Sequence, residues 1–468
     1  MVAFSKLPAE LRVHTWSFIP SQELPLLQSV SKVWNEEIGG TKSLYTVINN
    51  VTAVQLKHLL PRSFPRQVSA TIDCVCEDDY APFCTILRQH LSRISYLWLT
   101  FDRRAWRSAE NGDNVPIVYL LSAAAPRLRS CRIDTGLELM DVRFQVFAGT
   151  APIERLHLDG IQLLEPQRAF SNVVYFSGTA CWRGAPHDTL QIMTHVAHPA
   201  RHFPALRRLG LVGFDSISRI FNEGNPCPAG VTELELVYDP DYRYSGETAA
   251  AFANLHTVDN IRIESAPRPL MLQLLRSWFS AEVIRLVKDN TLTFVSGMHG
   301  SKNPKRLEFH LPHPVDLRDL VKVKVMPRAD VLMLGPKALQ HYSPAFIAGI
   351  VSTAAPNLRT LIVRLPPNSS GVILPQWIPG TPRLRMNRLQ CLLIAGKLGA
   401  DGTLPWITFK GIQSFVARVF DTEANTPGLP VGLHVSGVHL KDEDQKQLLE
   451  SGIFAVVQHE AKPLVFED

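Results

Sequence analysis

A six-residue pattern, Leu-x-x-Leu-x-Leu with Ile, Val or Cys in place of some leucines, recurs along most of the chain and limits its possible folds. The clearest copies begin at Ile94, Leu128, Ile153, Leu206, Val231, Val258, Leu358 and Leu389. Several intervals are close to 25 residues or to a multiple of it, so degenerate copies are expected in the long intervals, including 306–311 and 329–334. Such a period is typical of arrays in which each repeat is one small structural unit.

Two longer segments repeat each other more closely. Residues 117–133, IVYLLSAAAPRLRSCRI, match residues 347–363, IAGIVSTAAPNLRTLIV, at the Ser, Ala-Ala-Pro and Leu-Arg positions. Each segment is typical of an apolar helix, a proline stop and a short strand. One such unit cannot bury its apolar face alone, but stacked neighbours can. The sequence therefore predicts an α/β protein, and an ordinary domain of parallel β-α-β units is the alternative to a repeat array.

The front of the chain, residues 7–34, is short and rich in apolar side chains: LPAELRVHTWSFIPSQELPLLQSVSKVW. Its pattern predicts one helix that ends at Pro20 and a second from a Ser21 cap to Trp34. The second carries apolar residues almost all round, and a helix of that kind has to be covered. Some 30 residues have too little interior to cover it, so the segment packs on its own chain or keeps a surface for another protein.

The spacing of this segment resembles the F-box, a family whose members dock the Skp-type adaptor of SCF ubiquitin ligases. The resemblance covers about 40 residues and implies that the adaptor is contacted by Leu7, Pro8, Glu10, Leu11, Ile19, Leu24, Leu27, Val30 and Trp34. Two positions depart from the family pattern. Thr15 stands where the family has Ile or Val, and Pro25 lies inside the second predicted helix, where it would disturb the first turn.

The repeats beyond the front segment resemble leucine-rich repeats, in which a strand and a helix per unit form a curved solenoid. The ladder Asn or Cys of that family is absent, since Ile161 and Phe214 stand at its position in two copies, so the array is diverged. The expected fold is α/β: an all-α F-box module at 1–42, then an irregular leucine-rich-repeat-like solenoid at 43–430 with a curved parallel sheet and outer helices. A C-terminal cap follows at 431–468.

In a solenoid of this kind, the positions that flank the middle Leu of each strand face outward. These positions predict a substrate-binding face made of Tyr96, Trp98, Arg132, Arg155, His157, Arg208, Glu233, Glu235 and Arg262. The first half of this face is basic, and its sign changes at Glu233. An acidic patch of a protein substrate lying over Arg132, Arg155 and Arg208 is one hypothesis, because complementary charge sets association rate and specificity. The alternative is that these are ordinary solvated strand positions.

Other classes of function find little support. A formal net charge of +5 over 468 residues is too weak for the dense basic face of a nucleic-acid-binding protein. The chain has no secretory signal and no run long enough for a membrane span, so we expect no membrane partner, a cytoplasmic and/or nuclear location, and reduced cysteines. His195, His198 and His202 are spaced as metal ligands, but Pro199 interrupts their helix, so we predict no metal site.

The expected function is therefore that of the substrate-recognition subunit of an SCF-type E3 ubiquitin ligase, with no enzyme activity and no cofactor of its own. Its partners would be the Skp-type adaptor, a cullin-RING complex reached through it, and an unknown protein substrate. A non-ligase F-box scaffold or regulatory interaction protein is the second hypothesis. An enzyme whose site is assembled from distant residues is the third, although no nucleotide-binding, hydrolase or kinase motif occurs.

Overall fold

The structure is a computed structural model that places the chain in two compact units, Met1–Glu233 and Leu234–Asp468. The residues that it describes are 7–75, 80–101, 116–135, 139–183, 190–222, 225–239, 257–277, 283–288, 291–296, 305–310, 329–335, 357–366, 388–398, 402–420 and 431–460, with single positions at 246, 251, 255 and 347. Helices and a sheet dominated by parallel strands make the protein α/β, as predicted.

The helices of the first unit are short. They are α1 (Ala9–Trp16), α2 (Leu24–Gln28), α3 (Lys32–Gly40), α4 (Ala53–Arg62), α5 (Tyr80–His90), α7 (Pro116–Leu121), α8 (Thr194–Ala197), α9 (Pro199–His202) and α10 (Ile217–Ile220). In the described part of this unit, four 3-10 turns join or replace helices, at Lys42–Tyr45, Leu91–Arg93, Val146–Gly149 and Arg168–Phe170. Repeats in which a single turn replaces an α-helix are shorter, and this explains why the copies of the six-residue pattern are unevenly spaced in the sequence.

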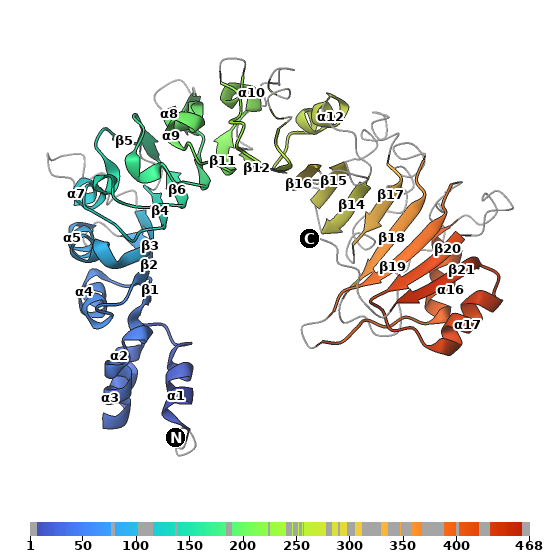
Figure 1. Ribbon diagram of the computed structural model, residues 1–468, viewed down its shortest axis with the longest axis horizontal. Coiled ribbons are helices and arrows are strands. Elements are labelled where there is room, and N and C mark those ends of the chain that lie inside the picture. Colours follow the sequence, from blue (N-terminus) through green and yellow to red (C-terminus); the bar gives the residue numbers. More distant parts are fainter. Residues whose placement is uncertain are drawn as a thin grey trace. The chain divides into compact units, whose positions relative to one another are not determined.

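The main strands of the first unit form one parallel ladder in chain order. They are β1 (Val47–Asn49), β2 (Val68–Val75), β3 (Ile94–Phe101), β4 (Ser130–Asp134), β6 (Arg155–Asp159), β8 (Tyr175–Thr179) and β11 (Arg208–Phe214). Helices α4, α5 and α7 line one side of β1 to β4 (Figure 1). Two small sheets lie outside the ladder: β5 (Met140–Val142) pairs with β7 (Ile161–Leu163), and β9 (Cys181–Arg183) with β10 (Leu190–Ile192).

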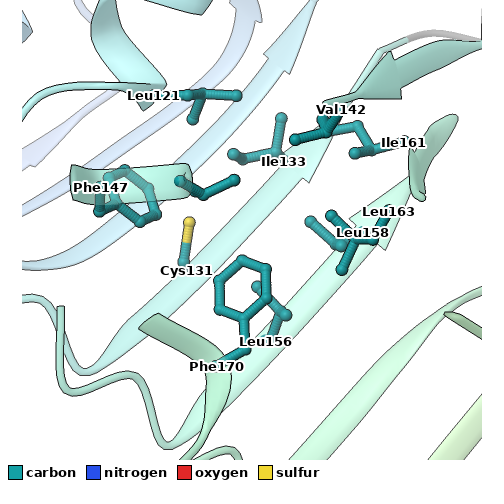
Figure 2. A pocket seen from close by; sticks show the side chains of 11 residues that line it. Leu121, Cys131, Ile133, Val142, Phe147, Leu156, Leu158, Ile161, Leu163 and Phe170 are labelled. Atoms are coloured by element: carbon teal, nitrogen blue, oxygen red, sulfur yellow. The ribbon is translucent and has the colours of Figure 1, made fainter. Parts of the chain in front are cut away.

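Alternation along these strands builds the core. In β4 and β6, Cys131, Ile133, Leu156 and Leu158 are buried and their neighbours are not. The buried side chains meet apolar residues of the opposite layer, as Figure 2 shows around Phe147 and Phe170. Only about 10 Å³ of free space is left between them, the lower limit for one water molecule. This interior is a packed core and has no room for a ligand.

Strand β8 fills the longest interval between copies in the first unit. It escapes the sequence pattern because Gly178 stands where a Leu is expected. A Cβ at Gly178 would lie 2.0 Å from the backbone oxygen of Leu158 on the neighbouring strand, so the chains approach too closely for any side chain. Val173 and Phe176, both fully buried, take the first and middle apolar positions of this degenerate copy.

Strand β12 (Glu233–Tyr238) begins at the last residue of the first unit, and the second unit holds a less regular ladder. Its strands are β13 (Asn260–Glu264), β14 (Val283–Lys288), β15 (Thr291–Ser296), β16 (Lys305–His310), β17 (Val331–Leu334), β18 (Thr360–Leu365), β19 (Cys391–Gly396), β20 (Val431–Ser436) and β21 (Phe454–Glu460). Strand β15 pairs antiparallel with β14 and with β16, while β13 pairs with β16 and β14 with β17. The spatial order 13-16-15-14-17 departs from chain order and was not predicted.

From β17 to β21 the ladder is again parallel and sequential. The strands at the predicted copies 306–311 and 329–334 are confirmed as β16 and β17. Helices α12 (Arg268–Ser277), α16 (Phe409–Val419) and α17 (Asp442–Glu450) belong to this unit. The tail adds β20, α17 and β21, so it continues the ladder. Of the two matched segments, the first is confirmed as α7 and β4, and most of the second lies outside the described residues, apart from β18.

Both faces of β17 to β19 are buried. Met333, Ile362 and Leu393, which share one register row, are 2–7% exposed, and Leu361 and Leu392 on the opposite face are equally enclosed. Ile362 and Leu393 occupy the strand positions that flank the middle Leu, which the repeat pattern assigns to the outward face, yet here both side chains are enclosed. Parallel strands covered on both sides carry continuous apolar runs, as these do.

Candidate protein-binding surfaces

The front of the chain forms three helices, α1 to α3, where the sequence predicted two. Helix α1 ends at Trp16, before Pro20. The second predicted helix is broken after Gln28, because the Ser31 hydroxyl accepts the Trp34 N–H at 3.2 Å and starts α3 there. Pro25 lies in the first turn of α2, where its missing N–H is not needed, so the expected disturbance does not occur.

These front helices, α1 to α3, have a small interior of their own. The rings of Trp16 and Trp34 pack edge to face with centroids 4.8 Å apart, and Leu24 and Ile38 are fully enclosed. Nε of Arg12 on α1 lies 3.1 Å from both carboxylate oxygens of Glu37 on α3. This contact lowers the pKa of Glu37, because the guanidinium hydrogen bond favours the charged carboxylate. The two helices are thus joined by aromatic packing and a two-pronged ion pair.

The front helices leave several large apolar side chains exposed to solvent. Large side chains that remain 48–76% exposed there are Leu11, Phe18, Leu26, Val30 and Val33. Of the residues predicted to contact an adaptor, those with exposed side chains are Leu7, Pro8, Glu10, Leu11 and Val30, and those that are half-buried are Ile19, Leu27 and Trp34. The prediction placed Leu24 at the same surface, but its side chain is fully enclosed, so its contribution is to the interior of the module.

This apolar surface continues into a groove beside α4. Pro25 and Leu26 from α2 face Val54, His58 and Leu59 from α4 across a cavity of about 410 Å³. The side chain of Arg62 at the end of α4 donates a hydrogen bond of 3.0 Å to the Gln28 amide oxygen, which joins the two helices at one end of the groove. Single exposed apolar residues are common, but several of them on one small module, with a groove beside them, are typical of a protein contact.

A second surface lies on the solvent side of the first unit's parallel ladder, which we call the strand face. The register aligns its side chains in three rows across the strands. The N-terminal row is Ser69, Tyr96, Ser130, Arg155, Tyr175 and Arg208; the central row is Thr71, Trp98, Arg132, His157 and Ser177; the C-terminal row is Thr100, Asp134, Asp159 and Thr179. The predicted residues from Tyr96 to Arg208 are therefore gathered on one face.

The central row is held together by direct contacts. The Arg132 guanidinium lies over the Trp98 ring, 4.3 Å from its centroid, and the Trp98 indole donates to the Thr100 hydroxyl at 3.1 Å. Nδ1 of His157 lies 2.7 Å from the Ser177 hydroxyl. Burial and the nearby Arg132 charge lower the pKa of His157 to about 4, so this imidazole is neutral at pH 7.

The basic residues of the strand face differ in their surroundings. Arg208 forms an ion pair of 3.2 Å with Glu233 and lies over the Tyr175 ring at 5.0 Å. Within the described residues, Arg155 is exposed and forms no ion pair. The three arginines proposed to hold an acidic patch are therefore not equivalent. Arg208 is neutralised, Arg132 is stacked on an indole, and Arg155 presents its charge to solvent without an ion-pair partner in the described part of the chain.

The two predicted residues in the second unit also form ion pairs. Arg262 lies 3.4 Å from Glu235, 2.9 Å from Glu264 and 4.0 Å from Glu308. His310 and Arg306 hold the same Glu308, and these hydrogen bonds lower the pKa of its carboxyl to about 2. The sequence predicted that the charge of the outward face changes from basic to acidic after Arg208. In the structure, the charged side chains beyond Arg208 instead neutralise one another in ion pairs.

Among the strand-face residues that the sequence analysis missed are Tyr175, Ser177, Asp134 and Asp159. The first two belong to β8, which the pattern did not reveal. The two aspartates lie one position beyond the last Leu of their copies, at matched register, and the pattern LHLD in β6 beside CRID in β4 was a signal for them. The Asp159 carboxylate accepts a hydrogen bond from the Thr179 hydroxyl.

Sites for chemistry are not evident in the described ranges. In them, no group of three or more His, Cys, Asp or Glu is arranged to hold a metal ion, and no helix is long and apolar enough to cross a membrane. Pro199 separates α8 from α9, as predicted, and leaves His198 exposed while His195 and His202 are buried. Burial raises the pKa of the Cys84 and Cys181 thiols to about 12, which makes both poor nucleophiles.

Comparison with models of known protein families and with curated proteins found no match to this chain. The functional conclusion therefore depends on the two surfaces described above and on the residues that form them.

Proposed function

We propose that the protein is the substrate-recognition subunit of an SCF-type E3 ubiquitin ligase. In this proposal the front helices are an F-box module that docks a Skp-type adaptor and, through it, a cullin-RING complex. The remainder is a diverged leucine-rich-repeat-like receptor, a solenoid with a curved parallel sheet and outer helices, that holds a protein substrate. The observation that carries the proposal is the apolar surface of Leu11, Phe18, Leu26 and Val30 on a module with the F-box spacing.

Packing within the front helices supports this assignment. The module uses Leu24, Ile38 and the two tryptophans for its own interior, so its remaining apolar residues are not required to hold it together. Apolar surface left in water costs free energy at about 25 cal/mol per Å², and cover by an adaptor would recover it. The groove between α2 and α4 would extend the same contact beyond residue 42.

The receptor would do no bond chemistry and need no cofactor. It would act by holding a substrate lysine near the ubiquitin-charged enzyme that the complex recruits, which raises the effective concentration of the two reactants. The sequential parallel ladder from β1 to β11 supports the receptor role, because it presents one continuous face of aromatic, basic and acidic side chains.

Affinity purification from cells tests the proposal. The wild type should recover the adaptor and a cullin, whereas a double Leu11→Glu, Val30→Glu variant should lose both and keep other partners. Leu449→Glu is the matched control, because Leu449 is a comparably exposed leucine on α17. A wild-type sample without adaptor would overturn the proposal. Adaptor without cullin would instead favour a non-ligase scaffold.

A further inference from the structure

The strand face separates positive from negative charge along the strand direction. All of its strands are parallel, so the N-terminal row lies at one edge and the C-terminal row at the other. Corresponding positions in these rows are four residues apart on a strand, which is about 13 Å. Arg155 lies in the first row, and Asp134 and Asp159 lie in the last.

The positive side is dominated by Arg155. Its neighbours in the row are Ser130 and Tyr175, neither of which is a basic residue, and the other arginine of the row, Arg208, is paired with Glu233 at 3.2 Å. Arg132 in the central row adds to this side, and its charge disfavours protonation of His157 more strongly than Asp134 favours it. The field over the first two rows is therefore positive.

The negative side consists of two carboxylates on neighbouring strands. Asp134 and Asp159 are direct register partners, so their side chains leave the same face side by side. The hydrogen bond that Asp159 accepts from Thr179 is from a neutral group and leaves its charge in place. Between the two charged edges, the central row on these two strands holds Arg132 and His157, and the Arg132 guanidinium lies over the Trp98 ring on β3.

From this geometry we infer that the strand face binds an extended protein segment with an acidic side chain over Arg155 and a basic side chain over Asp134 and Asp159. The two charged residues are four positions apart, since four extended residues also span about 13 Å. The residue between them lies over Arg132 and His157 of the central row. The inference deepens the proposed function and rests on it, because it names the class of substrate segment that the receptor takes.

The sequence-based hypothesis was an acidic patch, and the structure argues for a segment of mixed sign. A purely acidic segment long enough to reach from Arg155 to the far edge would place a carboxylate against Asp134 and Asp159. Like charges at that range repel, which a mixed segment avoids. Charge at both edges therefore gives the face selectivity against acidic and basic segments alike.

Synthetic peptides provide the test. Four 11-residue peptides share a central Leu and differ only at the positions two before and two after it. The first carries Glu before the Leu and Lys after it. The other three carry Glu, Lys or Ser at both positions. Binding to the full-length chain is measured by fluorescence anisotropy. The Glu/Lys peptide should bind at least about tenfold more tightly than the other three, in keeping with the effect of complementary charge pairs at interfaces. Equal affinities, or no binding by any peptide, would overturn the inference.

Two variants make the test independent of the peptide scaffold. Arg155→Glu turns the outer rows negative and should move the preference to the two-Lys peptide. Arg88→Glu is the matched control, because Arg88 is an exposed arginine on α5. The Arg88→Glu protein should keep the wild-type preference for the Glu/Lys peptide. An Arg155→Glu protein that keeps the Glu/Lys preference would contradict the charge assignment.

Adaptor binding by the same proteins separates this inference from the proposed function. Loss of the peptide preference with the adaptor and cullin still bound would overturn the inference alone. Retention of the preference without any adaptor binding would overturn the ligase role alone.

Discussion

Two buried histidines on the helical side of the first unit predict a specific loss of stability in acid. His195 and His202 are each 1% exposed, with ring centroids 6.3 Å apart, and His195 packs at 5.3 Å against the Phe176 ring. Nδ1 of His195 accepts the Leu163 N–H at 3.3 Å, whereas neither nitrogen of His202 has a hydrogen-bond partner among the described residues. Both imidazoles are thus held neutral in apolar surroundings.

The magnitude follows from the pKa of His202. Burial, with the charges of Arg201 and His198 as smaller contributions, lowers this pKa from 6.5 to about 4. Because the folded pKa lies below the unfolded one, the stabilising effect is complete above pH 6.5 and is lost as the pH falls toward 4. At about 1.4 kcal/mol for each tenfold change in proton activity, His202 alone removes about 2 kcal/mol of unfolding free energy between pH 7 and pH 5.

Urea unfolding of the full-length chain at pH 7 and pH 5 measures this effect. His202→Phe removes the titrating group and fills the apolar site, so its loss between the two pH values should be smaller than that of the wild type by about 2 kcal/mol. His58→Gln, at an exposed histidine of α4, is the control and should follow the wild type. An identical pH dependence for His202→Phe and the wild type would refute the reasoning.

Three further predictions test the packing, two of them with a control substitution. Gly178→Ala should destabilise the first unit by about 3 kcal/mol, because its Cβ would meet the Leu158 backbone oxygen at 2.0 Å. Gly40→Ala, at an open helical position of α3, should change the unfolding free energy by under about 1 kcal/mol, and equal thermal shifts would contradict this. In urea unfolding, Leu24→Ala should lower the unfolding free energy by about 2–5 kcal/mol and Leu26→Ala by under about 0.5 kcal/mol, because Leu24 is enclosed and Leu26 is exposed. Similar losses for the two variants would contradict the proposed interior of the front helices. Arg93→Met should lower the unfolding free energy by about 3 kcal/mol, because the Arg93 guanidinium donates hydrogen bonds to the Ser63 hydroxyl and to the carbonyls of Leu60 and Arg66. An unchanged unfolding free energy in the same assay would show that these hydrogen bonds do not stabilise the fold.

The parallel strands were predictable where the repeat pattern is intact. Copies at Leu128, Ile153 and Leu206 lead directly into β4, β6 and β11, because alternation within the motif fixes which side chains are buried. Strand β8 was not predictable in the same way, since a close backbone approach replaced Leu with Gly178. The antiparallel pairing of β14 with β15 does have a signal in the sequence, because only Asp289 and Asn290, both turn-forming residue types, separate the two β-rich runs.

The candidate surfaces were predictable to a different degree. Outward strand positions followed from periodicity, so Tyr96, Trp98, Arg132 and His157 are found on one face. Their charge states and partners did not follow from it, because ion pairs such as Arg208 with Glu233 form between strands about 25 residues apart. In the front helices, the motif could not distinguish Leu24, which fills the interior, from Val30, which is exposed.

The most direct test of the central claim is the affinity of the purified full-length chain for a purified Skp-type adaptor, measured by calorimetry. The account predicts one adaptor bound per chain, a negative heat-capacity change from burial of apolar surface, and loss of binding in the Leu11→Glu, Val30→Glu variant but not in Leu449→Glu. A folded wild-type chain that binds no adaptor, or a double variant that binds as well as the wild type, would contradict it.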